Sequence, residues 1–183
     1  MTMKDARRTE LLNAASELLA TNPTASLAEI AEHAGIGKAT LHRYFPSRDD
    51  LMLALGYRAL EMVTLAIADS QLEQGSTAAA LNRLAEHLIP LGDKLHFLLN
   101  ERILDTHPDF AAADRATQAP ILALIQRGQA DGEIRADLPA EWIRQHLNYA
   151  LYGTWQIVHE GFIARRDAAR LLVTTLINGI AAK

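Results

Sequence analysis

The side chains best suited to contact another molecule are three basic residues in a segment that has no acidic residue. Lys38, Arg43 and Arg48 lie in segment 33–48, which contains no Asp or Glu. Residues 1–50 together carry six Lys and Arg against seven Asp and Glu, so the positive charge is local. Local positive charge on a short helix suits contact with phosphates and with base edges in a groove. The segment therefore favours nucleic-acid recognition.

Two short helices joined by a tight turn are predicted to position these cations. Ser26 and Glu29 have capping-box spacing, which predicts a helix that begins near Leu27. Gly35 stands where the chain must turn, a conformation that glycine adopts without strain. A second helix is then predicted from Lys38 to Phe45.

The second helix has one apolar and one polar face. Leu41 and Phe45, four residues apart, form its predicted buried pair. Ala39 and Arg43 then lie on the opposite face, flanked by polar residues. Arginine pairs well with guanine in the major groove, so Arg43 is the strongest candidate for reading bases. The predicted DNA-contacting residues are Ser26, Lys38, Ala39, Thr40, His42, Arg43, Tyr44 and Arg48.

From about Arg7 to Leu53 the sequence resembles the tetracycline-repressor (TetR/AcrR-like) family of bacterial transcription regulators. The resemblance lies in the order of a first helix, then SLAEIAEHAGIGKATLHRYFPSRDDL. Two departures occur: Thr21-Asn22-Pro23 replaces a helix-ending glycine, and His42 replaces a tyrosine. The resemblance implies a homodimer that binds a double-stranded DNA operator. It also implies that Arg48 contacts a phosphate.

The whole chain is predicted to be all-α, with about nine helices. It has 183 residues, of which 49% are hydrophobic and 22% charged, and it lacks alternating β-type runs. Residues 1–46 are assigned to a helix-turn-helix DNA-binding domain, and residues 47–183 to an effector-binding and dimerisation domain. A helix from Arg48 to about Ser70 is long enough to belong to both. Further helices are predicted over 94–104 and 109–130, the latter interrupted or kinked by Pro120.

Several protein classes are excluded or disfavoured. The chain has no cysteine, which excludes thiolate metal sites, disulfides and cysteine nucleophiles. We expect no apolar run that approaches the roughly twenty residues that span a bilayer, and no apolar signal segment in the N-terminal residues. A cytoplasmic protein without a membrane partner is therefore expected.

The last two predicted helices, 140–160 and 167–180, carry few charges. A helix that contacts solvent along one side needs only one apolar stripe. These two helices have little charge on any side, so both are expected to be covered on two sides. Paired with the same helices of a second copy, they would form a four-helix interface. The predicted interface residues are Leu147, Ala150, Leu151, Gly153, Thr154, Leu172 and Leu176.

An apolar pocket with a few polar groups is predicted in the larger domain, suited to a small, partly hydrophobic effector. Its predicted residues are Met62, His96, Asn100, Tyr149, Tyr152 and Trp155. No metal site or cofactor is predicted, because the histidines lie on different helices.

These observations favour a ligand-responsive transcription regulator, a repressor released from its operator by a small molecule. A helical enzyme is the alternative from another class, although no nucleophile, phosphate loop or metal set is recognisable. A DNA-binding protein without an effector is the third hypothesis. No catalytic residue is assigned.

Overall fold

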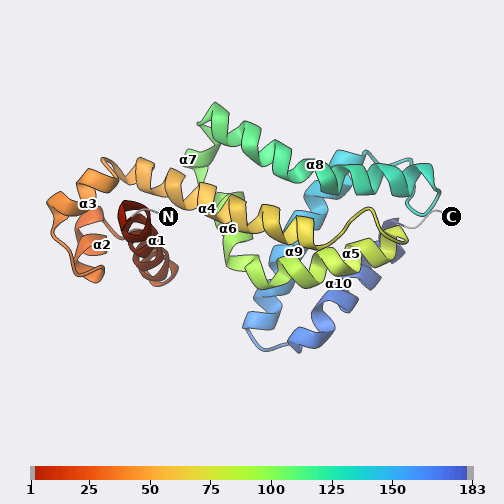
Figure 1. Cartoon of the computed structure of the whole chain (residues 1–183). Coiled ribbons are helices and arrows are strands. Elements are labelled where there is room, and N and C mark those ends of the chain that lie inside the picture. The colour runs from red at the N-terminus through yellow and green to blue at the C-terminus, as the bar shows by residue number, and fades with distance from the viewer. Residues whose placement is uncertain (1–2, 181–183) are drawn as a thin grey trace. The chain divides into compact units, whose positions relative to one another are not determined.

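The computed structural model describes residues 3–180 and is all-α across that range (Figure 1). Nine helices of seven or more residues are present there, as predicted, together with the one-turn helix α7 and a 3-10 turn, η1. The elements are α1 Met3–Thr21, α2 Leu27–His33, α3 Lys38–Tyr44, α4 Arg48–Asp69, α5 Thr77–Leu88, η1 Ile89–Leu91, α6 Gly92–Asn100, α7 Arg102–Asp105, α8 Pro108–Ala130, α9 Ala140–His159 and α10 Arg165–Ile180.

The chain forms two compact units. The first contains the chain up to Arg58 together with Glu101–His107, and the second contains Ala59–Asn100 and the chain from Pro108 onward. The division falls inside α4, so this helix contributes residues to both units. It differs from the predicted boundary after residue 46, and the assignment of a function to each part stays a prediction.

In the first unit, α1, α2 and α3 pack around a small apolar core. Leu11, Ala15 and Ile30 from α1 and α2 are buried together with Leu41 and Phe45. The predicted i, i+4 pair at the end of α3 is therefore confirmed as its buried side. The guanidinium carbon of Arg8 lies 5.2 Å from the centroid of the Phe45 ring, so α1 also contacts the end of α3.

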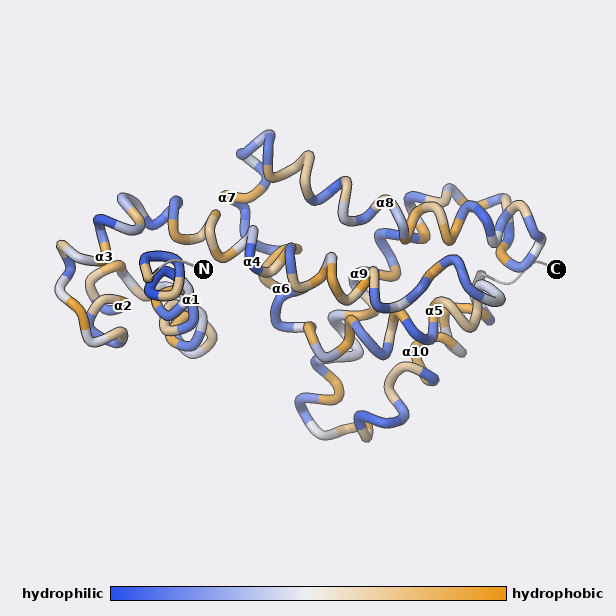
Figure 2. The backbone as a smooth tube through the Cα atoms, in the orientation of Figure 1, coloured by the Kyte–Doolittle hydropathy of each residue, from blue (hydrophilic) through white to orange (hydrophobic). Residues whose placement is uncertain are grey.

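In the second unit, α9 packs against α6, α8 and α10, while α5 packs against α8 and α10. Leu84, Ile121, Ile125, Ile143 and Leu151 lie in its core, each at most 1% exposed. Figure 2 shows hydrophobic and hydrophilic residues alternating along individual helices, the pattern that lets one face be buried and the other hydrated.

One predicted helix boundary is wrong, and one of the two predicted effects of Pro120 is ruled out. The helix predicted to continue to Leu104 ends at Asn100, and Glu101 caps the separate helix α7. Pro120 does not divide α8, which continues from Pro108 to Ala130. The predicted cap at Ser26 is confirmed. Ser76 caps α5, and Ser47 accepts a hydrogen bond from the Asp50 amide at the start of α4.

α4 is apolar enough and long enough to cross a membrane by composition alone. Its most apolar 18-residue window has a mean hydropathy of 1.6, and 56% of that window is buried inside the protein. The expectation that no segment approaches this criterion was wrong. Core helices of water-soluble proteins meet the same criterion, so the feature is weak support for a membrane span.

Candidate functional site

The turn between α2 and α3 is fixed by backbone hydrogen bonds. The amide of Ile36 donates to the carbonyl of Ala31, and Gly35 has a φ of +64°. This is the pattern that ends many helices, with glycine in the left-handed conformation just past the last turn. Gly37 then precedes α3 in an extended conformation. The turn thus sets the direction in which α3 leaves α2.

α3 presents a narrow exposed face. Leu41 is fully buried, whereas Lys38, Ala39 and Arg43 are exposed and Thr40 is half-buried. Neither Lys38 nor Arg43 forms an ion pair within residues 3–180. The Arg43 guanidinium carbon lies 5.9 Å from the Tyr44 ring centroid. Two cations on either side of the small Ala39 side chain form a surface that can approach an anionic groove closely.

His42 is half-buried and is held by a contact within the unit. Its Nδ1 lies 3.0 Å from the carbonyl oxygen of Pro46, which places the neutral or charged ring in a donor role at that nitrogen. Within residues 3–180 the other ring nitrogen, Nε2, has no hydrogen-bond partner and stays available. The bond fixes the ring beside the α3–α4 turn.

Arg48 connects the start of α4 to the loop between α1 and α2. Its Nη2 donates to the Pro23 carbonyl at 2.8 Å, and its Nη1 donates to the Ala25 carbonyl. Proline cannot donate a backbone hydrogen bond, and these two carbonyls lie in a turn outside any helix. Two of the five guanidinium donors are therefore used inside the protein, a role that the sequence analysis did not assign to Arg48.

Ser26 and Glu29 form the predicted capping box. The Glu29 carboxylate accepts hydrogen bonds from the Ser26 amide at 2.8 Å and from the Ser26 hydroxyl at 2.7 Å. These bonds, the backbone bond first, lower the pKa of the Glu29 carboxyl. A carboxylate already lies at the N-terminus of α2, so a phosphate contact by the Ser26 hydroxyl would require that hydroxyl to leave Glu29.

The second unit contains a row of stacked rings on α6 and α9. The His96 and Tyr152 ring centroids are 4.7 Å apart, those of Tyr152 and Trp155 are 6.0 Å apart, and those of Trp155 and His159 are 5.3 Å apart. We call these four residues the aromatic row. Asn100 Nδ2 lies 3.1 Å from His96 Nδ1 and also donates to the His96 carbonyl. Four predicted effector residues, His96, Asn100, Tyr152 and Trp155, are thus brought together.

The other two predicted effector residues lie outside the aromatic row. Met62 is half-buried on α4, and Tyr149 is 52% exposed on α9. The sequence analysis did not single out His159, which belongs to the aromatic row, or Gly92, against which the Trp155 side chain packs. Spacing could have identified His159, because residues 152, 155 and 159 share one side of a helix. Within the described residues no group of three or more His, Asp or Glu is placed to hold a metal ion.

Comparisons with known proteins agree with the geometry of α2 and α3. The family model described as bacterial regulatory proteins, tetR family, matches residues 11–55, the range that contains both helices. The HTH-type transcriptional repressor LfrR of Mycolicibacterium smegmatis is 30% identical over 183 residues, which covers 97% of this chain and 92% of that protein. The chain belongs to the TetR family.

Other relatives extend the likeness along the whole TetR-family chain. The HTH-type transcriptional regulator NfxB of Pseudomonas aeruginosa is 29% identical over 92% of this chain and 91% of that protein. The crystal structure of LfrR from Mycobacterium smegmatis in complex with proflavine has a TM-score of 0.82 at 28% identity and covers both chains fully. FadR from Bacillus subtilis, solved with stearoyl-CoA, has a TM-score of 0.70 at 17% identity and shares the fold.

Membership in this family makes the protein a helix-turn-helix transcription regulator, with α3 as the second helix of that motif. The family model and the relatives are described as transcription regulators. The structure adds which side chains of α3 are exposed and which are used within the fold.

The predicted interface on α9 and α10 needs correction. Leu147, Leu151 and Leu172 are buried in the core of a single chain, because these sides of α9 and α10 pack against helices of their own unit. Their burial in the chain's own core leaves them little surface for a second copy. Ala150, Gly153, Thr154 and Leu176 are half-buried and stay predicted interface residues. The exposed large apolar side chains on these two helices are Trp142, Tyr149, Ile157 and Leu171.

Proposed function

We propose that this TetR-family protein is a repressor whose α3 helices, one from each copy of a dimer, enter successive major-groove segments of a near-palindromic operator. The observation that carries the proposal is the exposed Lys38, Ala39 and Arg43 face of a helix anchored by the buried Leu41 and Phe45. A recognition helix needs both features, a fixed position and a free reading face.

The proposed contacts fall into two groups. Arg43 reads bases, with Ala39 and Thr40 in apolar or hydroxyl contact with neighbouring bases. Lys38, Tyr44, His42 and Ser26 contact phosphates, which position the helix without specifying sequence. Arg48 contributes its remaining donors to a phosphate while it holds the carbonyls of Pro23 and Ala25.

Dimerisation is proposed through the exposed sides of α9 and α10. Trp142, Tyr149 and Ile157 lie on α9, each more than 40% exposed, and Leu171 on α10 adds to them. Large apolar and aromatic side chains that are exposed on one chain are typical of interface cores. Gly153 lies between Tyr149 and Ile157 with no atom within 4 Å of a Cβ at that position, so a partner helix can approach there.

The effector is proposed to bind the second unit. LfrR was crystallised with proflavine, a flat aromatic cation, and the aromatic row of this chain offers ring faces for such a molecule. Binding would move α4, which contributes residues to both units. To release DNA, the effector must bind the DNA-incompetent arrangement more tightly than the competent one. A cytoplasmic location is proposed because the operator lies there.

A mobility-shift titration with proflavine tests this function. DNA flanking the protein's own coding region is the probe, because repressors of this kind often bind near their own genes. The wild-type protein should shift this DNA, and saturating proflavine should release it. Release by proflavine from the wild type but not from a Trp155→Ala variant would locate the effect in the aromatic row. A shift that proflavine leaves unchanged would favour an effector-independent DNA-binding protein.

A further inference from the structure

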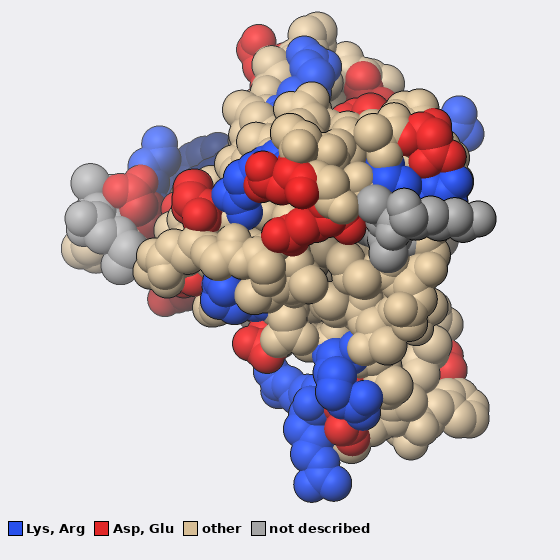
Figure 3. All heavy atoms as spheres, turned by 90° about the vertical axis from the view of Figure 1, so that its right-hand side faces the viewer, with Lys and Arg blue, Asp and Glu red and all other residues tan. Residues whose placement is uncertain are grey.

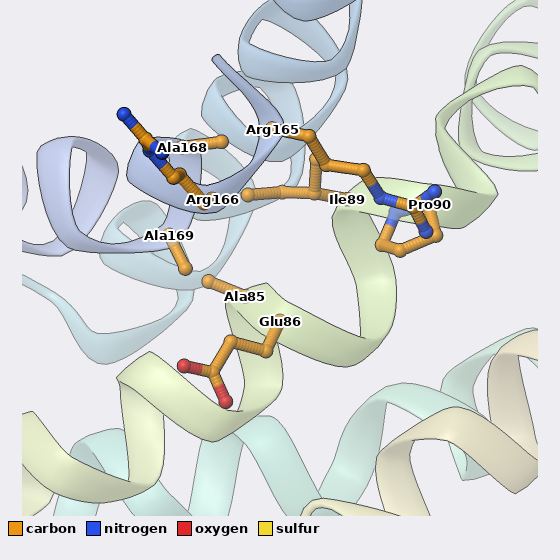
Figure 4. A pocket seen from close by; sticks show the side chains of 8 residues that line it. All are labelled: Ala85, Glu86, Ile89, Pro90, Arg165, Arg166, Ala168 and Ala169. Atoms are coloured by element: carbon orange, nitrogen blue, oxygen red, sulfur yellow. The ribbon is translucent and has the colours of Figure 1, made fainter.

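The second unit has a surface hollow that lies outside the aromatic row and the proposed dimer face. Its volume is about 500 Å³, and it lies between the end of α5 with η1 and the first turns of α10 (Figure 4). The lining residues are Ala85, Glu86, Ile89, Pro90, Arg165, Arg166, Ala168 and Ala169. A volume of this size suits a small organic molecule.

The floor of the hollow is apolar. Ala85, Ile89, Ala168 and Ala169 are all buried, so their aliphatic carbons form the surface that packs α5 against α10. A hydrocarbon group placed on this floor would lose contact with water on one side at least, which stabilises binding in proportion to the apolar area covered.

Two arginines border the floor, and neither is neutralised by a close ion pair. Arg165 forms no ion pair within residues 3–180, and Arg166 only approaches Asp167, at 3.8 Å with its side chain 88% exposed. Asp167 is also approached by Arg170, at 3.4 Å. Figure 4 shows the two side chains leaving the start of α10 in opposite directions, with Arg165 extending toward Pro90 at the edge of the hollow. Figure 3 shows basic side chains gathered in the lower part of the view. This is the height at which Figure 1 shows the turn between α9 and α10.

Glu86 makes the two sides of the hollow opposite in charge. It lies on α5, across the hollow from the arginines, and its carboxylate accepts a hydrogen bond from Asn82. An anionic group is attracted to the α10 side and repelled from the α5 side. The start of α10, a helix of 16 residues, adds the positive end of its dipole on the same side as the arginines.

We propose that this hollow binds a small amphipathic carboxylate, with the carboxylate at the Arg165 guanidinium and an apolar body across Ala85, Ile89 and Ala169. Arginine holds carboxylates through paired hydrogen bonds, and the buried methyl groups contact the apolar body. The site is independent of the proposed function: it needs neither DNA binding nor a role in induction.

Calorimetric titration of the full chain with octanoate tests the site. Octanoate should bind once per chain, and 1-octanol and octylamine, which have the same alkyl length without a carboxylate, should bind more weakly. The variant Arg165→Ala should lose about tenfold or more in octanoate affinity, because charge-assisted hydrogen bonds are lost. Glu86→Gln should raise octanoate affinity, because a repelling charge is removed. Arg170→Ala, a cation on the same helix that does not line the hollow, should leave it unchanged.

The position of the ligand is read separately from its affinity. In a sample with labelled isoleucine methyl groups, octanoate should shift the Ile89 signal and leave the Ile134 signal, which belongs to a buried residue outside the hollow, in place. The proposal is overturned if octanoate fails to bind at millimolar concentration, if octanol binds equally well, if the Arg165→Ala variant binds as the wild type does, or if Ile134 shifts instead of Ile89.

The outcome is distinguishable from that of the proposed function. Octanoate that binds and leaves operator affinity unchanged supports the site and denies it a role in induction. A protein that binds octanoate and no DNA would refute the proposed function while it supports the site.

Discussion

The Trp155 side chain lies directly on the backbone of Gly92. A Cβ built on Gly92 would come within 2.0 Å of Trp155 Cγ and 2.2 Å of Trp155 Cβ. Because the second atom is next to the backbone of α9, rotation of the indole alone cannot relieve the overlap. The start of α6 and the middle of α9 can therefore approach this closely only with glycine at residue 92.

Substitution of Gly92 by alanine should therefore destabilise the second unit. The added methyl group must push α6 from α9, at a cost of about 1–3 kcal/mol in the free energy of unfolding. Urea denaturation followed by tryptophan fluorescence measures this cost. Gly179→Ala is the matched control: no atom lies within 4 Å of its Cβ position, and alanine in a helix should stabilise by up to about 1 kcal/mol. Equal stability of both variants would contradict the close packing.

Arg48 should be a structural residue first and a phosphate contact second. Arg48→Ala removes both hydrogen bonds to Pro23 and Ala25, and the free energy of unfolding should fall by about 1–2 kcal/mol. Arg48→Lys keeps the positive charge but cannot replace a forked donor, so it should lose similar stability. The salt dependence of DNA binding should stay near that of the wild type for Arg48→Lys and weaken for Arg48→Ala. A lysine variant with wild-type melting temperature would disprove the structural role.

The exposed side of α9 should carry the dimer contact. Tyr149→Asp places a charge at the centre of the proposed interface, and light scattering at micromolar concentration should then give a monomer mass. Leu65→Asp is the control, because Leu65 is a still more exposed apolar residue, 60% exposed, on a different helix. It should leave the dimer intact. A wild-type protein that is itself monomeric would refute the interface.

The capping box should make the first unit sensitive to acid. The pKa of Glu29 is lower in the folded chain than its ordinary value, so the stabilisation is complete above that ordinary value, near 4.5. It is lost as the pH falls through the lower, folded-state pKa. Glu29→Gln should thus lower the melting temperature at pH 7, and the difference should shrink below pH 4. Glu32→Gln, on the same helix and outside the box, should show no such trend.

The helix-turn-helix segment from Ser26 to Phe45 was predictable because its determinants are local. Ser26, Glu29, Gly35 and the Leu41 and Phe45 pair each fix structure within a few residues, and all were confirmed. The long helices were predictable from apolar spacing. Spacing along one helix does not say which of two apolar stripes packs inside its own chain. This is why Leu147, Leu151 and Leu172 were assigned to an interface while Trp142 and Ile157 are exposed.

Contacts across long sequence separations could not be predicted. The role of Arg48 depends on two carbonyls that lie 23 and 25 residues earlier. The aromatic row depends on α6 packing against α9, and Trp155 could not be placed on Gly92 from the sequence. The hollow between α5 and α10 was not predicted either, because Glu86 and Arg165 lie on helices far apart in the chain.

Selection of bound sequences from a random DNA library tests the central assignment, that α3 reads the operator through Arg43, most directly. The wild type should enrich an inverted repeat whose half-sites are about one or two helical turns apart. Arg43→Ala should enrich the same repeat with one position per half-site relaxed, a loss of about 1–3 kcal/mol of discrimination there. Arg115→Ala, an exposed cation on α8, should select the wild-type sequence. An Arg43→Ala selection identical to that of the wild type would contradict the account.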